Sequence, residues 1–201
     1  MTGRAVLAEK TRWRTALVSA RRALSADERA ERAAALAAAA VDVATATGGP
    51  VCAYLPVGSE PGSPELVAAL HEAGHEVLLP VVPADPGPLD WAAYTGPGSL
   101  GAGPLGLREP TGPRLGPDAI TRARLVLVPG LAADRRGVRL GRGAGYYDRT
   151  LRLASPDVPI IIVLNDEELV ERLPAEPHDR PVTGALLTGA GLVTLGNNRR
   201  P

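Results

Sequence analysis

Residues 125–149 read LVLVPGLAADRRGVRLGRGAGYYDR and join an apolar run to a segment rich in glycine and arginine. The apolar run, residues 125–128, predicts a short buried strand. Residues 146–153 predict a helix, so the glycine-rich part lies between a strand and a helix N-terminus. That position favours the binding of negative charge, because the first N–H groups of a helix have no partners within the helix.

The centre of this segment has the composition of a polyphosphate site. It alternates three glycines with other residues, in the order Gly141, Arg142, Gly143, Ala144, Gly145. Glycine has no Cβ and tolerates positive φ, so backbone N–H groups can converge on phosphate oxygens. Arg139 and Arg142 would add charged donors. A glycine triplet can also form a simple tight turn, and the segment has neither the Walker A nor the dinucleotide pattern of glycines.

Residues 129–149 resemble the signature of the 5-formyltetrahydrofolate cyclo-ligase family, also called methenyltetrahydrofolate synthetase. The resemblance covers the Pro-Gly-Leu-Ala lead, the Asp-Arg-Arg-Gly turn, Arg-Leu-Gly, and Gly-x-Gly-Tyr-Tyr-Asp-Arg. Family members usually have Phe where this chain has Ala133. The resemblance implies that residues 139 and 141–146 contact ATP, and that Arg142 and Tyr146 act in catalysis. It also implies folate contacts for Tyr146 and Tyr147, either of which could instead pack in the core.

Composition limits the classes of function. The chain has 201 residues, which suits a single domain spanning 1–201. Its 22 basic and 22 acidic residues cancel, so there is no broad electrostatic case for nucleic acid or an acidic membrane. A single cysteine, Cys52, excludes a disulfide framework. No run is long enough to span a bilayer, and we expect a cytoplasmic protein that acts as a monomer.

The first predicted helix, residues 6–22, carries a stripe of cations. Lys10, Arg14 and Arg21 share one of its faces, and Lys10 is the only lysine in the chain. Such a stripe is usually a solvated face. Here it borders an apolar stripe that includes Trp13 and Leu17, so the cations could point into a cleft. The family resemblance extends to this pair and implies that Lys10 and Arg14 contact ATP phosphates, with Lys10 also acting in catalysis.

Glu60 lies in a loop that follows a predicted strand at residues 51–55. Ligands of open α/β sheets gather beyond the carboxyl ends of the strands. A lone loop glutamate is ordinarily a surface residue. The resemblance implies that Glu60 and Leu55 contact the folate, although the next residues, 61–63, depart from the family pattern.

Two aspartates are candidate magnesium ligands by resemblance. Asp148 ends the signature segment, and Asp179 belongs to a His-Asp pair at residues 178–179. Magnesium keeps several waters and is usually held by one or two carboxylates plus substrate phosphates. Either aspartate could equally cap a helix or turn. Family members usually have an acid where this chain has Gly189.

The remaining pattern predicts an α/β fold, a three-layer α/β/α sandwich with a largely parallel central sheet. A capping box at Ser25 opens a second helix that reaches about residue 45. Further helices are expected at 64–73 and 166–173, and further strands at 76–82, 89–94, 160–164 and 185–188. Residues 83–117 form a long excursion, whose Gly-Leu-Arg-Glu-Pro element at 106–110 resembles a family element of unassigned role.

The resemblance implies ATP- and magnesium-dependent cyclisation of 5-formyltetrahydrofolate. The formyl oxygen would attack the γ-phosphate of ATP, and the second folate nitrogen would then close the ring and expel phosphate. The alternatives are a diverged relative that binds ATP without this folate activity, and an interaction protein whose arginines dock an acidic partner or RNA. Nucleotide binding without cyclisation would indicate the first alternative, and salt-sensitive binding indifferent to Mg²⁺ would indicate the second.

Overall fold

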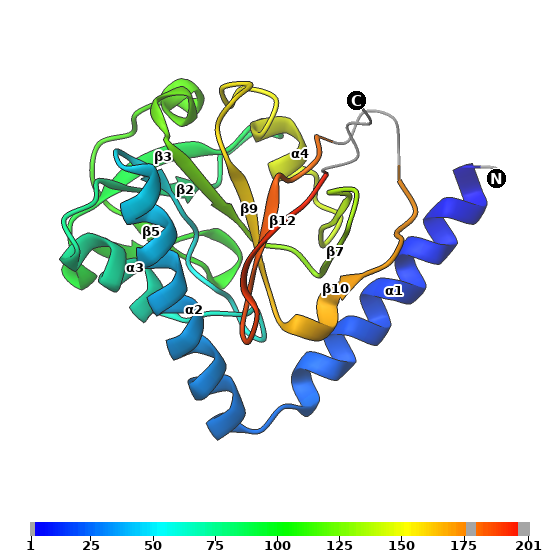
Figure 1. Ribbon diagram of the computed structural model, residues 1–201. Coiled ribbons are helices and arrows are strands. Elements are labelled where there is room, and N and C mark those ends of the chain that lie inside the picture. Colours follow the sequence, from blue (N-terminus) through cyan, green and yellow to red (C-terminus); the bar gives the residue numbers. More distant parts are fainter. Residues whose placement is uncertain (1–2, 176–179, 197–201) are drawn as a thin grey trace.

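The structure of the chain, a computed structural model, describes residues 3–175 and 180–196 (Figure 1). Its main sheet has seven strands in the order β12-β11-β9-β6-β1-β2-β3. These strands are β1 (Val51–Cys52), β2 (Val77–Val81), β3 (Asp90–Tyr94), β6 (Leu125–Val128), β9 (Ile160–Leu164), β11 (Gly184–Leu187) and β12 (Gly191–Thr194).

The five inner strands are parallel, and both edge strands are antiparallel to their neighbours. The inner strands are almost completely buried, which explains the unbroken runs of Val, Leu and Ile in β6 and β9. Each run that the sequence predicted as a strand contains one, although β1 covers only residues 51–52 of the predicted 51–55. The edge strand β12 was not predicted. It has only four residues, which are partly buried or exposed, and it follows β11 after a tight turn.

Helices cover both faces of the main sheet, which confirms the predicted α/β class. One face packs against α2 (Ala26–Thr47) and α3 (Pro64–Glu72), where alanines of α2 allow close approach. The other face packs against α4 (Tyr146–Thr150), the 3₁₀ segment η3 (Pro117–Arg122) and connecting loops. The predicted capping box is formed: the Ser25 hydroxyl accepts from the N–H of Glu28, whose carboxylate accepts from the N–H of Ser25.

The first helix, α1 (Gly3–Ala23), packs against a smaller sheet rather than the main one (Figure 1). This sheet has the order β10-β7-β8, with β7 at Ala132–Asp134, β8 at Arg139–Leu140 and β10 at Leu169–Val170. Leu17 of α1 is buried against it, with Trp13 and Val18 beside it. Because β7 and β8 belong to the signature segment, this packing brings α1 to the glycine loop.

The helix expected at residues 166–173 is not formed. The chain makes one 3₁₀ turn, η4 (Asp166–Glu168), and then enters β10, which pairs with β7. Of the three acidic residues of this turn, Glu168 forms a capping box with Asn165, whereas Asp166 accepts from residues 188–190 and Glu167 pairs with Arg32. Pairing with a strand distant in sequence overrides the local helical pattern.

Residues 83–117 fold over one end of the main sheet. They contain β3, two further 3₁₀ turns and an antiparallel pair, with bounds η1 (Pro97–Ser99), β4 (Leu100–Ala102), η2 (Pro104–Gly106) and β5 (Arg108–Pro110). No helix in the described part of the chain is long and apolar enough to cross a membrane.

Candidate active site

A pocket of about 400 Å³ opens at the carboxyl ends of the parallel strands. Tyr54 and Leu55 reach it just after β1, Val82 after β2, and Gly130 after β6. Such a crevice at the strand ends is the usual ligand site of an open α/β sheet. The remaining walls come from the Glu60 loop, the β4–β5 hairpin, and the signature residues Arg139, Gly141, Arg142, Gly143, Ala144, Gly145, Tyr146, Tyr147 and Asp148.

The glycine loop lines one side of this pocket. Gly143 and Gly145 have φ angles of 104° and 74°, as the sequence predicted. Gly141 has no positive φ, but a Cβ there would lie 2.9 Å from a guanidinium nitrogen of Arg139. No described residue accepts a hydrogen bond from the backbone N–H groups of residues 142–145. The loop therefore offers a series of unused donors, whereas α4, with five residues, adds little helix dipole.

Arg14 reaches this loop from α1. Its Nε donates to the carbonyl oxygen of Gly141 at 2.9 Å, and its guanidinium lies 3.5 Å from where a Cβ of Gly143 would be. Lys10 lies one turn earlier on the same face of α1 and is partly buried. Neither side chain lines the main pocket. Arg14 thus reaches the glycine loop from the side of α1, and Lys10 lies one turn earlier on the same helix.

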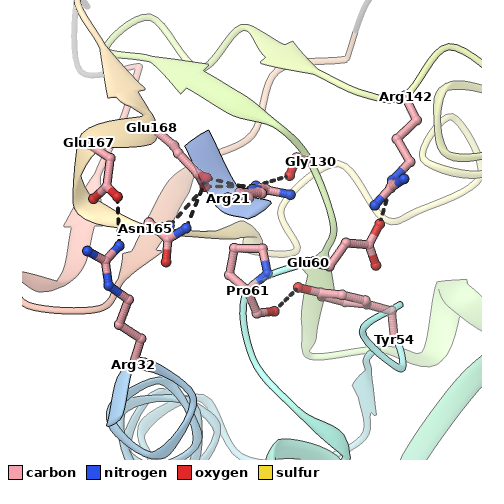
Figure 2. A network of polar contacts seen from close by, with 10 residues as sticks. All are labelled: Arg21, Arg32, Tyr54, Glu60, Pro61, Gly130, Arg142, Asn165, Glu167 and Glu168. Carbon is pink, nitrogen blue, oxygen red and sulfur yellow. Dashed lines mark hydrogen bonds and ion pairs between the residues drawn. The ribbon is translucent and has the colours of Figure 1, made fainter. Parts of the chain in front are cut away.

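The third cation of the stripe, Arg21, is not part of a solvated face. Its side chain is 1% exposed and forms a two-point ion pair with Glu168, at 2.6 and 2.7 Å (Figure 2). It also donates to the carbonyl oxygen of Gly130 at 2.7 Å, on the wall of the pocket. Arg21 therefore fixes α1 against the end of β6.

Glu60 is nearly buried, with 10% of its side chain exposed, so it is not an ordinary surface acid. Its carboxylate accepts from Nε of Arg142 at 2.9 Å and from the N–H of Val57 at 3.0 Å. Tyr54 holds the same loop by donating to the carbonyl oxygen of Pro61, and burial raises the pKa of this phenol (Figure 2). Two predicted site residues, 82 positions apart in the chain, are thus joined at the pocket.

Arg139 and Asp148 form an ion pair with each other. The side chain of Arg139 is 6% exposed, donates to the carbonyl oxygen of Pro129, and lies 5.8 Å from the centre of the Tyr147 ring. Arg139 is therefore held by protein groups as well as being close to the pocket. Asp148 is about half exposed, and no described residue donates a hydrogen bond to its second carboxylate oxygen.

No group of three or more His, Cys, Asp or Glu side chains in the described ranges could hold a metal ion. Of the two predicted magnesium ligands, Asp148 lies at the pocket and Asp179 lies outside the described residues. Asp148 offers one carboxylate, whose Oδ1 already accepts from Arg139, so an ion here would depend on water and phosphate oxygens for its other ligands.

Both tyrosines of the signature line the pocket. Burial raises the pKa of the Tyr147 phenol, which packs against the main core. The ring of Tyr146 lies beneath the guanidinium of Arg149, at 5.3 Å. Leu55, the other predicted substrate contact, lies beside them at the end of β1. Each tyrosine thus combines a packing role with access to the pocket.

The pocket includes one acid that was assigned no role from the sequence, Glu109 of the β4–β5 hairpin. Its side chain is mostly buried, and one carboxylate oxygen accepts from the N–H of Val82 at 2.8 Å. The Gly-Leu-Arg-Glu-Pro element was the available signal, but only the folded hairpin carries this residue to the pocket.

Of the three departures from the family pattern, residues 61–63 follow Glu60 beside the pocket, where the carbonyl oxygen of Pro61 accepts from Tyr54, and the other two lie away from it. Ala133 is completely buried in the core on β7 and does not line the pocket. Gly189 donates its N–H to the carboxylate of Asp166 at 2.7 Å, and Thr188 and Ala190 donate to the same group. Burial alone would raise the pKa of Asp166, but these hydrogen bonds together hold it below its ordinary value.

Comparisons of the sequence and of the structure with known proteins point to the same family. The model of the 5-formyltetrahydrofolate cyclo-ligase family matches residues 6–188. A 5-formyltetrahydrofolate cyclo-ligase of Mycolicibacterium smegmatis is 51% identical over 153 residues, which cover 74% of this chain and 78% of the relative. The cyclo-ligase of Escherichia coli K12 is 32% identical over 134 residues, which cover 66% of this chain and 74% of the relative.

Two solved structures have the same fold. The 5,10-methenyltetrahydrofolate synthetase of Aquifex aeolicus aligns with a TM-score of 0.75 and 26% identity, over 96% of this chain and 95% of its own. The synthetase of Mycoplasma pneumoniae aligns with a TM-score of 0.67 over 87% of this chain and 95% of its own. At 20% identity, the second match supports the fold alone.

Proposed function

Because the chain belongs to the 5-formyltetrahydrofolate cyclo-ligase family and is a ligase, we propose that it converts 5-formyltetrahydrofolate and ATP to 5,10-methenyltetrahydrofolate, ADP and phosphate. The observation that best supports a phosphate-transferring role is the glycine loop, whose N–H groups at residues 142–145 have no partner among the described residues. These donors lie next to Arg14 and to a pocket large enough for a pteridine ring.

The chemistry explains why a phosphate site is needed. Closing the five-membered ring requires loss of the formyl oxygen, which is a very poor leaving group. In the proposed reaction this oxygen attacks the γ-phosphate, the O–P bond forms, and ADP leaves. The second folate nitrogen then attacks the formyl carbon, loses its proton, and the oxygen departs within phosphate. No side-chain nucleophile is required, so catalysis relies on positioning and charge stabilisation.

We assign the ATP phosphates to the glycine loop with Lys10 and Arg14, and the folate to the pocket beside Glu60. The Glu60–Arg142 ion pair would set the wall between the two substrates, since Arg142 belongs to the glycine loop and Glu60 to the loop after β1. Tyr146, Tyr147 and Leu55 would pack against the folate, and Arg139 would orient Asp148. When bound with ATP, Mg²⁺ would neutralise phosphate charge, with Asp148 and Asp179 as its proposed ligands.

Ion pairing of the signature arginines disfavours a nucleic-acid or acidic-protein docking surface. Arg139 pairs with Asp148, Arg142 with Glu60, and Arg136 with Asp134. Binding phosphate backbones would require free cations on one exposed face. We therefore propose small-molecule substrates; that the enzyme is a monomer remains a prediction from the sequence.

The test is an absorbance assay for 5,10-methenyltetrahydrofolate, with ATP or Mg²⁺ omitted in separate controls. Lys10→Ala and Arg14→Ala are each expected to raise the KM for ATP about tenfold or more, because a charge-assisted hydrogen bond is lost. Arg12→Ala is the matched control, since Arg12 is exposed on the same helix and lies two residues from both. Its kinetics should match those of the wild type.

The cyclo-ligase proposal would be overturned if the folded protein forms no product while calorimetry shows that it still binds ATP. That result would instead identify a diverged nucleotide-binding relative. Ala133, in the core, and Gly189, bonded to Asp166, give no structural reason for such a loss, so it would point to the altered loop at residues 61–63.

A further inference from the structure

Three acids line the pocket, and they differ in how their charge is compensated. Glu60 pairs with Arg142, and Asp148 pairs with Arg139. Glu109 is 6% exposed and has no ion-pair partner among the described residues. The pocket therefore contains one nearly buried carboxylate whose charge is left without a cation.

The hydrogen bonds of Glu109 are also incomplete. Oε1 accepts from the N–H of Val82 at 2.8 Å, while no described group donates to Oε2. A buried carboxylate normally has several donors, because desolvating an ionised oxygen without compensation is costly. Oε2 is not among the described atoms that are fully buried without a partner, so it keeps some exposure and can accept from a ligand that brings N–H donors.

The hairpin holds the carboxylate closely in place. A Cβ added at Gly103 would lie 2.7 Å from the Cδ of Glu109 and 2.9 Å from its Oε2. Gly103 also donates its N–H to the carbonyl oxygen of Leu107, which closes the turn between β4 and β5. Glycine at position 103 therefore avoids a clash with this carboxylate where the hairpin meets the pocket.

The walls near Glu109 are apolar and suit a flat ring. The apolar residues that line the pocket around the ends of β2 and β3 and the hairpin are Leu79, Pro80, Val82, Leu89 and Leu107. A polar group fixed among apolar walls is the usual means by which a pocket orients a ring.

We propose that Glu109 recognises the donor edge of the substrate's aminopyrimidinone ring, and so determines specificity for the pteridine. This inference rests on the proposed function. The edge presents a ring N–H next to an exocyclic amino group, and these two adjacent donors match two carboxylate oxygens. The edge of adenine pairs an amino donor with a ring acceptor, which a carboxylate would repel. Glu109 therefore selects the folate rather than the nucleotide.

The test is Glu109→Gln, assayed with 5-formyltetrahydrofolate and with its analogue in which the 2-amino group is replaced by methyl. The amide oxygen can still accept from the N–H of Val82. The new amide NH₂, however, is a donor and would meet the donor edge of the substrate ring, where no hydrogen bond can form. We expect the KM for the natural folate to rise about tenfold or more, with the KM for ATP unchanged within about twofold. The wild type should disfavour the analogue by a similar factor, and Glu109→Gln should have lost that discrimination.

Glu72→Gln is the control, because Glu72 is an exposed acid at the end of α3. Three results for Glu109→Gln would overturn the inference. These are an unchanged KM for the natural folate, an equal rise in KM for both folates, and a rise in the KM for ATP. If Glu109→Gln folds poorly, Glu109→Asp keeps the charge and should retain discrimination against the analogue.

Failure of the proposed function can be told apart from failure of this inference. If the wild type forms no product, equilibrium binding of the two folates, measured by isothermal titration calorimetry, still measures the role of Glu109. Equal affinity of the wild type for both folates would then reject it.

Discussion

Replacing Arg21 by methionine should destabilise the protein strongly, because it removes one partner of a buried ion pair. Arg21 and Glu168 are 1% and 3% exposed, and their contacts are 2.6 and 2.7 Å long. Without Arg21, the carboxylate of Glu168 keeps only the donors of Asn165, at 2.9 and 3.0 Å. The carbonyl oxygen of Gly130 loses its donor as well.

The expected cost follows from leaving a charge buried without its partner. Breaking such a pair by removing one member costs about 3–5 kcal/mol of unfolding free energy. For a domain of this size each kcal/mol lowers the Tm by about 2–4 °C, so the Tm of Arg21→Met should fall by about 6–20 °C. Replacing Glu168 by leucine at the same time removes the orphaned charge, so the double variant should be more stable than Arg21→Met.

The assay is urea unfolding followed by circular dichroism, with both single variants, the double variant and Arg22→Met as control. Arg22 is the next residue on α1 and is exposed, so its loss should change stability by less than about 0.5 kcal/mol. A loss below about 1 kcal/mol for Arg21→Met would refute the argument. So would a double variant whose loss equals the sum of the single losses, since that would mean that the two residues do not interact.

Gly137→Ala should cost about 2–4 kcal/mol, since Gly137 has a φ of 86° and a Cβ there would lie 2.3 Å from the carbonyl oxygen of Val182. Gly74→Ala, with a φ of 88° but open space, should cost only about 1 kcal/mol in the same urea titration, and equal losses would contradict this reasoning. Burial alone would raise the pKa of Asp134, but its hydrogen bonds hold the pKa in the folded protein below the ordinary 3.8. The ionised carboxylate therefore stabilises the fold above pH 3.8, and this stabilisation is lost as the pH falls through the pKa of the folded protein. Asp134→Asn should flatten the pH dependence of stability in that acidic range, and an unchanged slope would count against the assignment. Burial raises the pKa of Cys52 to about 12, so a thiol reagent at pH 8 should modify this single cysteine only on unfolding, and rapid labelling of native protein would disprove it.

The sequence was a good guide to the elements that local pattern specifies. Residues 125–128 and 160–164 are apolar, β-prone runs of strand length, and both are inner strands of the main sheet. Ser25 and Glu28 have the spacing of a capping box, and the box is formed. These features depend on neighbours within a few residues, so the order of residues alone predicts them.

The helix predicted for residues 166–173 shows where local pattern fails. Leu169 and Val170 form β10 because Ala133 and Asp134 lie beside them, more than thirty positions earlier in the chain. The small strands β7 and β8 were likewise not predicted, because strands of two or three residues give too few alternations to form a pattern.

For the site, the order of residues is enough to predict the chemical groups: the glycine loop, its arginines, the tyrosines, and the acids that were candidates for binding. The partners and the burial of these groups follow from the folded arrangement of the chain. It paired Arg142 with Glu60, buried Arg21 against Glu168, and left Glu109 in the pocket without a cation. The physical reason is that charge compensation and desolvation depend on distances between segments far apart in the chain, which no local spacing of residues contains.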